Sequence, residues 1–172
     1  MKVLKSKRAL STVVTTLIIL VVSVLLATVV TFYAINVTTT RVQEESLQIT
    51  NLHVWCNDAG YATAAFVITN TGGRDVVLEK ITVRGVEIPG ASIYYKTVTS
   101  VSDPDYADDP SDLNGYKQVG TDALVLSSGS RMIIYLFGLS HISTSDIGVT
   151  VSVVVFTANA QYHKETNIQA AP

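Results

Sequence analysis

The 172-residue sequence contains one cysteine, Cys56, so no disulfide can form within the chain. A domain without such a cross-link must be stabilised by its hydrophobic core or by neighbouring molecules. A free thiol in an exported protein can pair with a second chain, whereas a cysteine in a β-strand commonly packs as a small hydrophobic side chain. We favour the packed interpretation for Cys56 and leave interchain pairing open.

The sequence also lacks the residue patterns on which most catalytic and metal sites are built. Its three histidines, His53, His141 and His163, are far apart and have no partner at ligand spacing, whereas zinc needs four convergent donors. There is no glycine-rich phosphate loop and no Gly-x-Ser-x-Gly motif. We therefore predict no catalytic residue, no metal and no cofactor, and we do not expect an enzyme.

Charge is absent from the thirty-two residues between Ala9 and Thr40, which follow a basic cluster at Lys5–Arg8. The apolar stretch Val13–Ile35 exceeds the roughly 20 residues that cross a bilayer and the roughly 7–15 of a secretory signal. Because neither Pro nor Gly interrupts residues 10–46, we predict one helix there. Such a helix would be roughly 55 Å long, against a bilayer core of about 30 Å, so its polar end would stand outside the membrane.

Basic residues are unevenly distributed along the chain. Residues 1–9 contain four bases and no acid, whereas residues 10–172 contain eight bases and fourteen acids and carry a net charge of −6. Basic flanks of a membrane helix stay in the cytoplasm, so we expect everything after the helix to be exported. Nucleic-acid binding needs a basic face, which the acidic remainder does not offer. We divide the chain into a basic leader (1–9), a helix (10–46) and a head (47–172).

From Leu47 onward the hydrophobic pattern changes to the two-residue period of β-strands. The adjacent glycines Gly72 and Gly73 predict a hairpin turn. Short strands separated by turn residues at near-regular spacing are typical of a β-sandwich. The expected strands are 48–56, 61–70, 76–83, 86–88, 92–100, 123–126, 131–137, 148–157 and 160–169. The predicted fold class is therefore α+β, a long N-terminal apolar helix followed by an antiparallel β-sandwich head.

One stretch of the head, residues 100–122, has no hydrophobic period and is rich in aspartate. We predict a long surface loop, either solvated or facing a partner. Its carboxylates could supply oxygen ligands to Ca²⁺, but their spacing is not that of an EF-hand, and we favour the metal-free interpretation. The aspartates are Asp103, Asp105, Asp108, Asp109, Asp112 and Asp122.

The N-terminus resembles that of archaeal type IV pilins. The resemblance is carried by Lys7-Arg8-Ala9, then Leu10-Ser11-Thr12-Val13-Val14, and the apolar helix that follows. In that family a membrane prepilin peptidase cuts such a leader after its small residue. The resemblance therefore implies a leader site at Arg8, Ala9 and Leu10, with cleavage between Ala9 and Leu10. Val14 stands where bacterial type IV pilins carry a glutamate, an absence that is common in the archaeal branch.

The head also resembles the Ig-like heads of exported archaeal subunits, through residues 66–73, 80–85 and 126–130. The combined resemblance implies a structural subunit of an extracellular archaeal adhesion pilus, which is a homopolymer built through the N-terminal helix. Its implied partners are identical subunits, the prepilin peptidase and the pilus assembly machinery. The subunit would lie in the cytoplasmic membrane before assembly and on the cell surface afterwards.

Two further features of the helix bear on this interpretation. Ser23, Ala27 and Thr31 recur at every fourth position, and small residues let helix backbones approach closely, so we expect them to contact neighbouring helices. Asn36-Val37-Thr38 is an N-x-S/T sequon, which makes Asn36 a candidate N-glycosylation acceptor.

Two alternatives remain. A permanently anchored Ig-like binding module, such as an archaellum stator-like protein, would keep residues 1–9. An archaellin would also polymerise, but its leader is usually richer in glycine than Arg8-Ala9-Leu10-Ser11.

Overall fold

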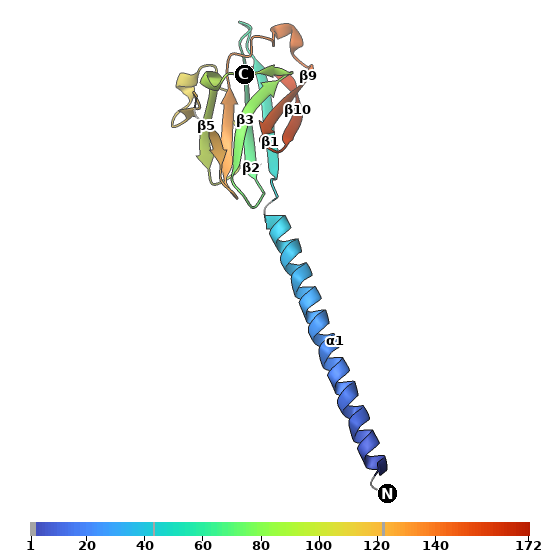
Figure 1. Cartoon of the computed structure of the whole chain (residues 1–172). Helices are drawn as coiled ribbons and strands as arrows, with labels where there is room; N and C mark the ends of the chain where they lie inside the picture. Colours follow the sequence, from blue (N-terminus) through green and yellow to red (C-terminus); the bar gives the residue numbers. More distant parts are fainter. Residues whose placement is uncertain (1–2, 43, 122) are drawn as a thin grey trace. The chain divides into compact units, whose positions relative to one another are not determined.

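The computed structural model describes residues 3–42, 44–121 and 123–172, with side chains from Leu10 onward apart from those at 40–42. The chain forms two compact units, Met1–Val42 and Gln43–Pro172. The first is a single helix and the second is a β-rich head (Figure 1). The α+β prediction is thereby confirmed at this level.

The N-terminal unit is one uninterrupted helix, α1, from Val3 to Val42. Its segment Leu10–Thr39 is long and apolar enough to cross a membrane. The helix does not reach Ser46 as predicted, because residues 44–46 are not helical and belong to the head. There the Ser46 carbonyl accepts hydrogen bonds from the amides of Thr71 (2.9 Å) and Gly72 (3.1 Å). These bonds take the place of further helical ones.

The head is built around one hydrogen-bonded sheet in the order β4-β3-β9-β10-β1-β2-β8-β5-β6, with β7 paired to β3. All neighbouring pairs are antiparallel except β1 and β10, which run parallel through Val54–Cys56 and Ile168–Ala170. The strands are β1 Leu47–Cys56, β2 Ala62–Asn70, β3 Val76–Val83, β4 Val86–Glu87, β5 Ile93–Val98, β6 Lys117–Gln118, β7 Leu124–Leu126, β8 Arg131–Leu136, β9 Thr150–Thr157 and β10 Gln161–Ala170.

This topology differs from the two separate sheets that the sequence predicts for a sandwich. The parallel β1–β10 pair joins what would be the two layers, so the head is a curled, mostly antiparallel sheet. A bulge in β1 contributes to the bending: Asn51 has φ 49°, and the register with β2 shifts between Thr50 and His53. Bulges increase local twist and bend a strand.

The curled sheet encloses one main hydrophobic core. Side chains from both halves of the sheet meet there, including Val54, Phe66, Ile81, Ile134 and Val153, and each of them is at most 1% exposed. Short apolar strands bury their alternate residues inward, which accounts for this set. Its existence shows that the two halves face one another.

A second cluster lies on the opposite face of β1, β2 and β8, and we call it the outer cluster. Its buried members are Trp55, Ala65, Val67, Ala107, Ile133, Tyr135 and Phe137. Because Ala107 belongs to the aspartate-rich loop, that loop covers the outer face of the sheet.

Candidate functional site

The surface of α1 is the first candidate site, since every side chain from Leu10 to Thr39 is exposed in the helical unit. Leu17 is 61% exposed, Leu26 60% and Phe32 70%. A contiguous apolar surface of this length is unusual for a soluble monomer. It marks a surface that is covered either by membrane lipid or by another protein molecule.

Many hydroxyl groups on this helix hydrogen-bond to its own carbonyls, so they add little polarity to its surface. The Ser23 hydroxyl donates to the Ile19 carbonyl (2.7 Å) and the Thr31 hydroxyl to the Ala27 carbonyl (2.8 Å). Hydroxyls of membrane helices bond back to the preceding turn in this way. Further hydroxyls with such bonds include those of Thr15, Thr16, Thr28, Thr38 and Thr39.

Two of the three predicted packing residues lie together in a shallow, open notch on the helix. The notch has a volume of about 490 Å³ and includes Ala27 and Thr31, whereas Ser23 lies outside its lining. Its remaining residues, Val24, Thr28, Phe32 and Ile35, were not singled out in the sequence. The sequence could have indicated three of them. Val24, Phe32 and Ile35 stand three positions before and five and eight positions after Ala27, which places these large side chains beside Ala27 on one side of a helix.

The leader and glycosylation residues also lie on the helix. Residues Arg8, Ala9 and Leu10 are helical, Leu10 is 68% exposed, and the side chains of Arg8 and Ala9 lie outside the described part. The Asn36 amide nitrogen donates to the Phe32 carbonyl at 3.0 Å. N-glycosylation replaces one of the two hydrogens on that nitrogen and leaves the other free to donate, so the bond does not itself exclude a glycan. Both modifications stay predictions.

The segment that follows the helix is bound to the head by several polar contacts. The Glu45 carboxylate accepts hydrogen bonds from the hydroxyl of Thr157 and, at 2.9 Å, from the amide of Asn159. The Tyr162 hydroxyl donates to the Glu45 carbonyl at 3.3 Å. Burial and the negative charge of Glu45 raise the pKa of Tyr162. Glu45, predicted as part of a helical stalk, therefore closes the β9–β10 turn instead.

The aspartate-rich loop is held against the outer cluster by specific bonds. The Tyr135 hydroxyl donates to the Asp105 carbonyl at 2.7 Å. The Asp108 carboxylate accepts from Asn57 and from Tyr106, both at 2.7 Å. Asp103 lies 3.0 Å from the His53 ring, which stacks on Trp55 with centroids 5.2 Å apart. The carboxylates of Asp103 and Asp108 thus face protein groups, and Asp105 contributes its main-chain carbonyl.

These contacts bear on the calcium interpretation. Across residues 3–42, 44–121 and 123–172, no group of three or more His, Cys, Asp or Glu side chains gathers as a metal site would require. Asp122 lies outside the described residues. The Asp109 side chain accepts from the Ser111 amide (2.9 Å) and caps the turn Pro110–Asp112, and these hydrogen bonds lower the pKa of Asp109.

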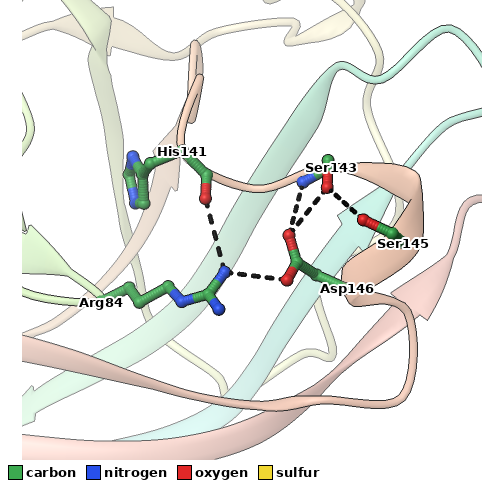
Figure 2. Close-up of polar contacts among 5 residues, drawn as sticks. All are labelled: Arg84, His141, Ser143, Ser145 and Asp146. Atoms are coloured by element: carbon green, nitrogen blue, oxygen red, sulfur yellow. Dashed lines mark hydrogen bonds and ion pairs between the residues drawn. The ribbon is translucent and has the colours of Figure 1, made fainter.

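An ionic cluster links the β3–β4 turn to the loop after β8. The Arg84 guanidinium lies 3.0 Å from the Asp146 carboxylate and donates to the His141 carbonyl at 3.4 Å, as Figure 2 shows. The other Asp146 oxygen accepts from the amide and hydroxyl of Ser143, each at 2.9 Å. Those bonds, followed by Arg84, lower the pKa of Asp146. His141 enters the cluster through its main chain, so the geometry is that of a capped turn.

Cys56 is 1% exposed and belongs to the main core. Burial, together with the charges of Asp146 and Asp58, raises the pKa of its thiol. This confirms the interpretation of Cys56 as a packed hydrophobic side chain.

No protein-family model matches this chain, and no curated protein sequence matches it either.

Proposed function

We propose that this protein is a structural subunit of an extracellular filament of the archaeal type IV pilus kind, an adhesion pilus, and not an enzyme. The observation that carries the proposal is α1, whose segment Leu10–Thr39 is uncharged, is exposed in its own unit and bonds many of its hydroxyls to its own carbonyls. Removing apolar surface from water contributes about 25 cal/mol per Å², so such a helix is stabilised, relative to water, either in lipid or among copies of itself.

The notch at Ala27 and Thr31 supports helix–helix contact in particular. Lipid tails are fluid and need no complementary surface, whereas a neighbouring helix gains van der Waals contacts by inserting a large side chain into such a notch. We propose that Phe32 or a leucine of a second copy occupies it. The head would then form the outer surface of the filament, and we propose that its curled sheet is a variant of the Ig-like heads of that family.

The leader residues give the order of events in this proposal. The chain is first inserted in the cytoplasmic membrane with residues 1–9 inside, the prepilin peptidase cuts between Ala9 and Leu10, and the assembly machinery extracts the helix into the growing filament. An uncharged helix suits both environments, because its backbone bonds are internal and it carries no charge that needs water.

Electron microscopy of sheared surface filaments, combined with N-terminal sequencing of their subunit, tests the proposal. We expect filaments whose subunit begins at Leu10. A protein that stays in the membrane as a monomer and begins before Arg8 would contradict the proposal and would establish the anchored-module alternative instead.

A further inference from the structure

The turn formed by Asn114 and Gly115 is the only Asn-Gly sequence in the chain. Both residues are exposed, and Gly115 has φ 79°, a conformation that glycine adopts without strain. Asparagine followed by glycine is chemically labile, because no Cβ hinders the attack of the glycine nitrogen on the asparagine side chain. The turn therefore combines an exposed electrophile with an unhindered nucleophile.

A cation lies directly on this peptide group. The Lys96 ammonium donates a hydrogen bond to the Asn114 carbonyl at 3.3 Å. A Cβ atom placed on Gly115 would stand 3.5 Å from the same nitrogen. The carbonyl of Asn114 and the N–H of Gly115 belong to one peptide unit, and its electrons are delocalised over both. A positive charge at the oxygen therefore stabilises the anion that forms when the Gly115 nitrogen loses its proton.

The position of this ammonium is fixed from two sides. Lys96 lies in β5, where it is paired with Ile133 of β8. Its ammonium is also 5.3 Å from the ring centroid of Tyr116, and that ring packs edge-on against Tyr135 at 5.2 Å. Cation–π attraction of this kind favours the rotamer that reaches the turn.

We propose that Asn114-Gly115 is a site of spontaneous covalent modification that Lys96 activates. The Gly115 nitrogen, after losing its proton to solvent, attacks Cγ of Asn114. The bond from Cγ to the side-chain nitrogen breaks, ammonia leaves, and a five-membered succinimide forms. Water then opens either carbonyl of the ring and yields aspartate or isoaspartate at position 114.

The product changes the loop in two ways. It adds one negative charge to an already acidic segment, and isoaspartate lengthens the main chain by one methylene between Leu113 and Tyr116. Both of these residues pack on the outer cluster. The modification therefore acts where the aspartate-rich loop is held to the sheet.

The test follows deamidation in the folded full-length protein, kept in detergent micelles at mildly alkaline pH, by mass spectrometry of the peptide that contains residue 114. We expect Lys96→Met to slow the reaction roughly fivefold, since two unit charges about 4 Å apart in water interact by about 1 kcal/mol. Lys96→Arg keeps the charge and should deamidate at close to the wild-type rate. Lys117→Met removes a nearby exposed charge that makes no hydrogen bond to Asn114 and should leave the rate unchanged.

Denatured protein provides the second comparison. Lys96 and Asn114 are eighteen positions apart, so in denaturant the wild type and Lys96→Met should deamidate at the same rate. The proposal is overturned if folded Lys96→Met reacts as fast as the wild type or faster. It is equally overturned if residue 114 of the folded wild type stays an amide while the denatured chain reacts.

Discussion

Gly72 lies so close to Glu44 that a Cβ atom on Gly72 would stand 2.6 Å from the Glu44 carbonyl oxygen and 2.8 Å from the Ser46 nitrogen. The contact is made by main-chain atoms, which cannot rotate away as a flexible side chain would. The segment 44–46 thus packs flat on the hairpin that follows β2. A glycine is needed there for space.

We expect Gly72→Ala to lower the free energy of unfolding by roughly 1–3 kcal/mol, the usual cost of overpacking. Thermal unfolding of the full chain in detergent, followed by the fluorescence of the single tryptophan, Trp55, measures the loss. Trp55 is 7% exposed, so its emission reports the folding of the head. An unchanged midpoint would show that segment 44–46 can shift without cost.

Asn70 is fully buried and holds the same hairpin from inside. Its amide nitrogen donates to the carbonyls of Arg74 (2.8 Å) and Leu126 (3.0 Å), and its oxygen accepts from Gly72 (2.9 Å). Asn70→Asp would place a carboxylate oxygen against two carbonyls. We expect a loss of roughly 2–4 kcal/mol in unfolding free energy.

The matched control for that variant is Asn167→Asp, at an exposed position of β10. The same chemical change there should cost less than about 0.5 kcal/mol. Urea denaturation of both variants makes the comparison, and equal losses would show that the bonds of Asn70 are not what stabilises the hairpin.

The local elements of this protein could be predicted from the sequence because local rules determine them. An uncharged run without Pro or Gly gives α1. Alternating residues between turns give β1 and β3, and a largely apolar run between turns gives β2, all close to their observed bounds. The predicted end of the helix was wrong because Glu45 and Ser46 hydrogen-bond to partners more than twenty residues away in the sequence. No local pattern reveals such partners.

The curl of the sheet and the outer cluster could not be predicted for a related reason. The parallel pairing of Val54–Cys56 with Ile168–Ala170 joins distant parts of the chain. One signal was nevertheless available: β2 has five consecutive apolar residues, from Ala64 to Ile68, and is buried on both faces. A continuous apolar strand indicates that both faces are covered, and here the aspartate-rich loop covers the second.

Alkaline pH should loosen that loop before it affects the rest of the head. Burial, and then the hydrogen bond and charge of Asp108, raise the pKa of Tyr106 from 10.0 to about 12. A raised pKa means that the folded state holds the proton more tightly than the unfolded state. The stabilising contribution is complete below pH 10 and is lost as the pH rises through 12.

We therefore expect the unfolding temperature of the wild type to fall above pH 10 and to fall less steeply in Tyr106→Phe. Tyr61→Phe, which removes a phenol that is 70% exposed, should leave the alkaline slope unchanged. If Tyr106→Phe and the wild type lose stability with pH at the same rate, ionisation of Tyr106 is not the cause of the alkaline loss.

Cys56 should be unreactive in the folded protein. Burial raises the pKa of its thiol, and the thiolate is the reactive form. Because a reagent can reach it only through opening of the core, we expect labelling by a maleimide to be about 100-fold slower, or slower still, than in denaturant. A disulfide-linked dimer on a non-reducing gel of native protein would contradict this expectation.

The helix notch gives the sharpest test of the proposed assembly. Ala27→Leu places a larger side chain in the notch beside Phe32 and keeps the helix apolar, so insertion into the membrane should be unchanged. Overpacking at a helix contact costs about 1–3 kcal/mol, repeated in every subunit, so we expect few or short filaments by electron microscopy. Ala34→Leu makes the same change outside the notch and should assemble better. Normal filaments from Ala27→Leu would exclude the notch as a contact, whereas wild-type protein that never forms filaments would refute the assembly itself.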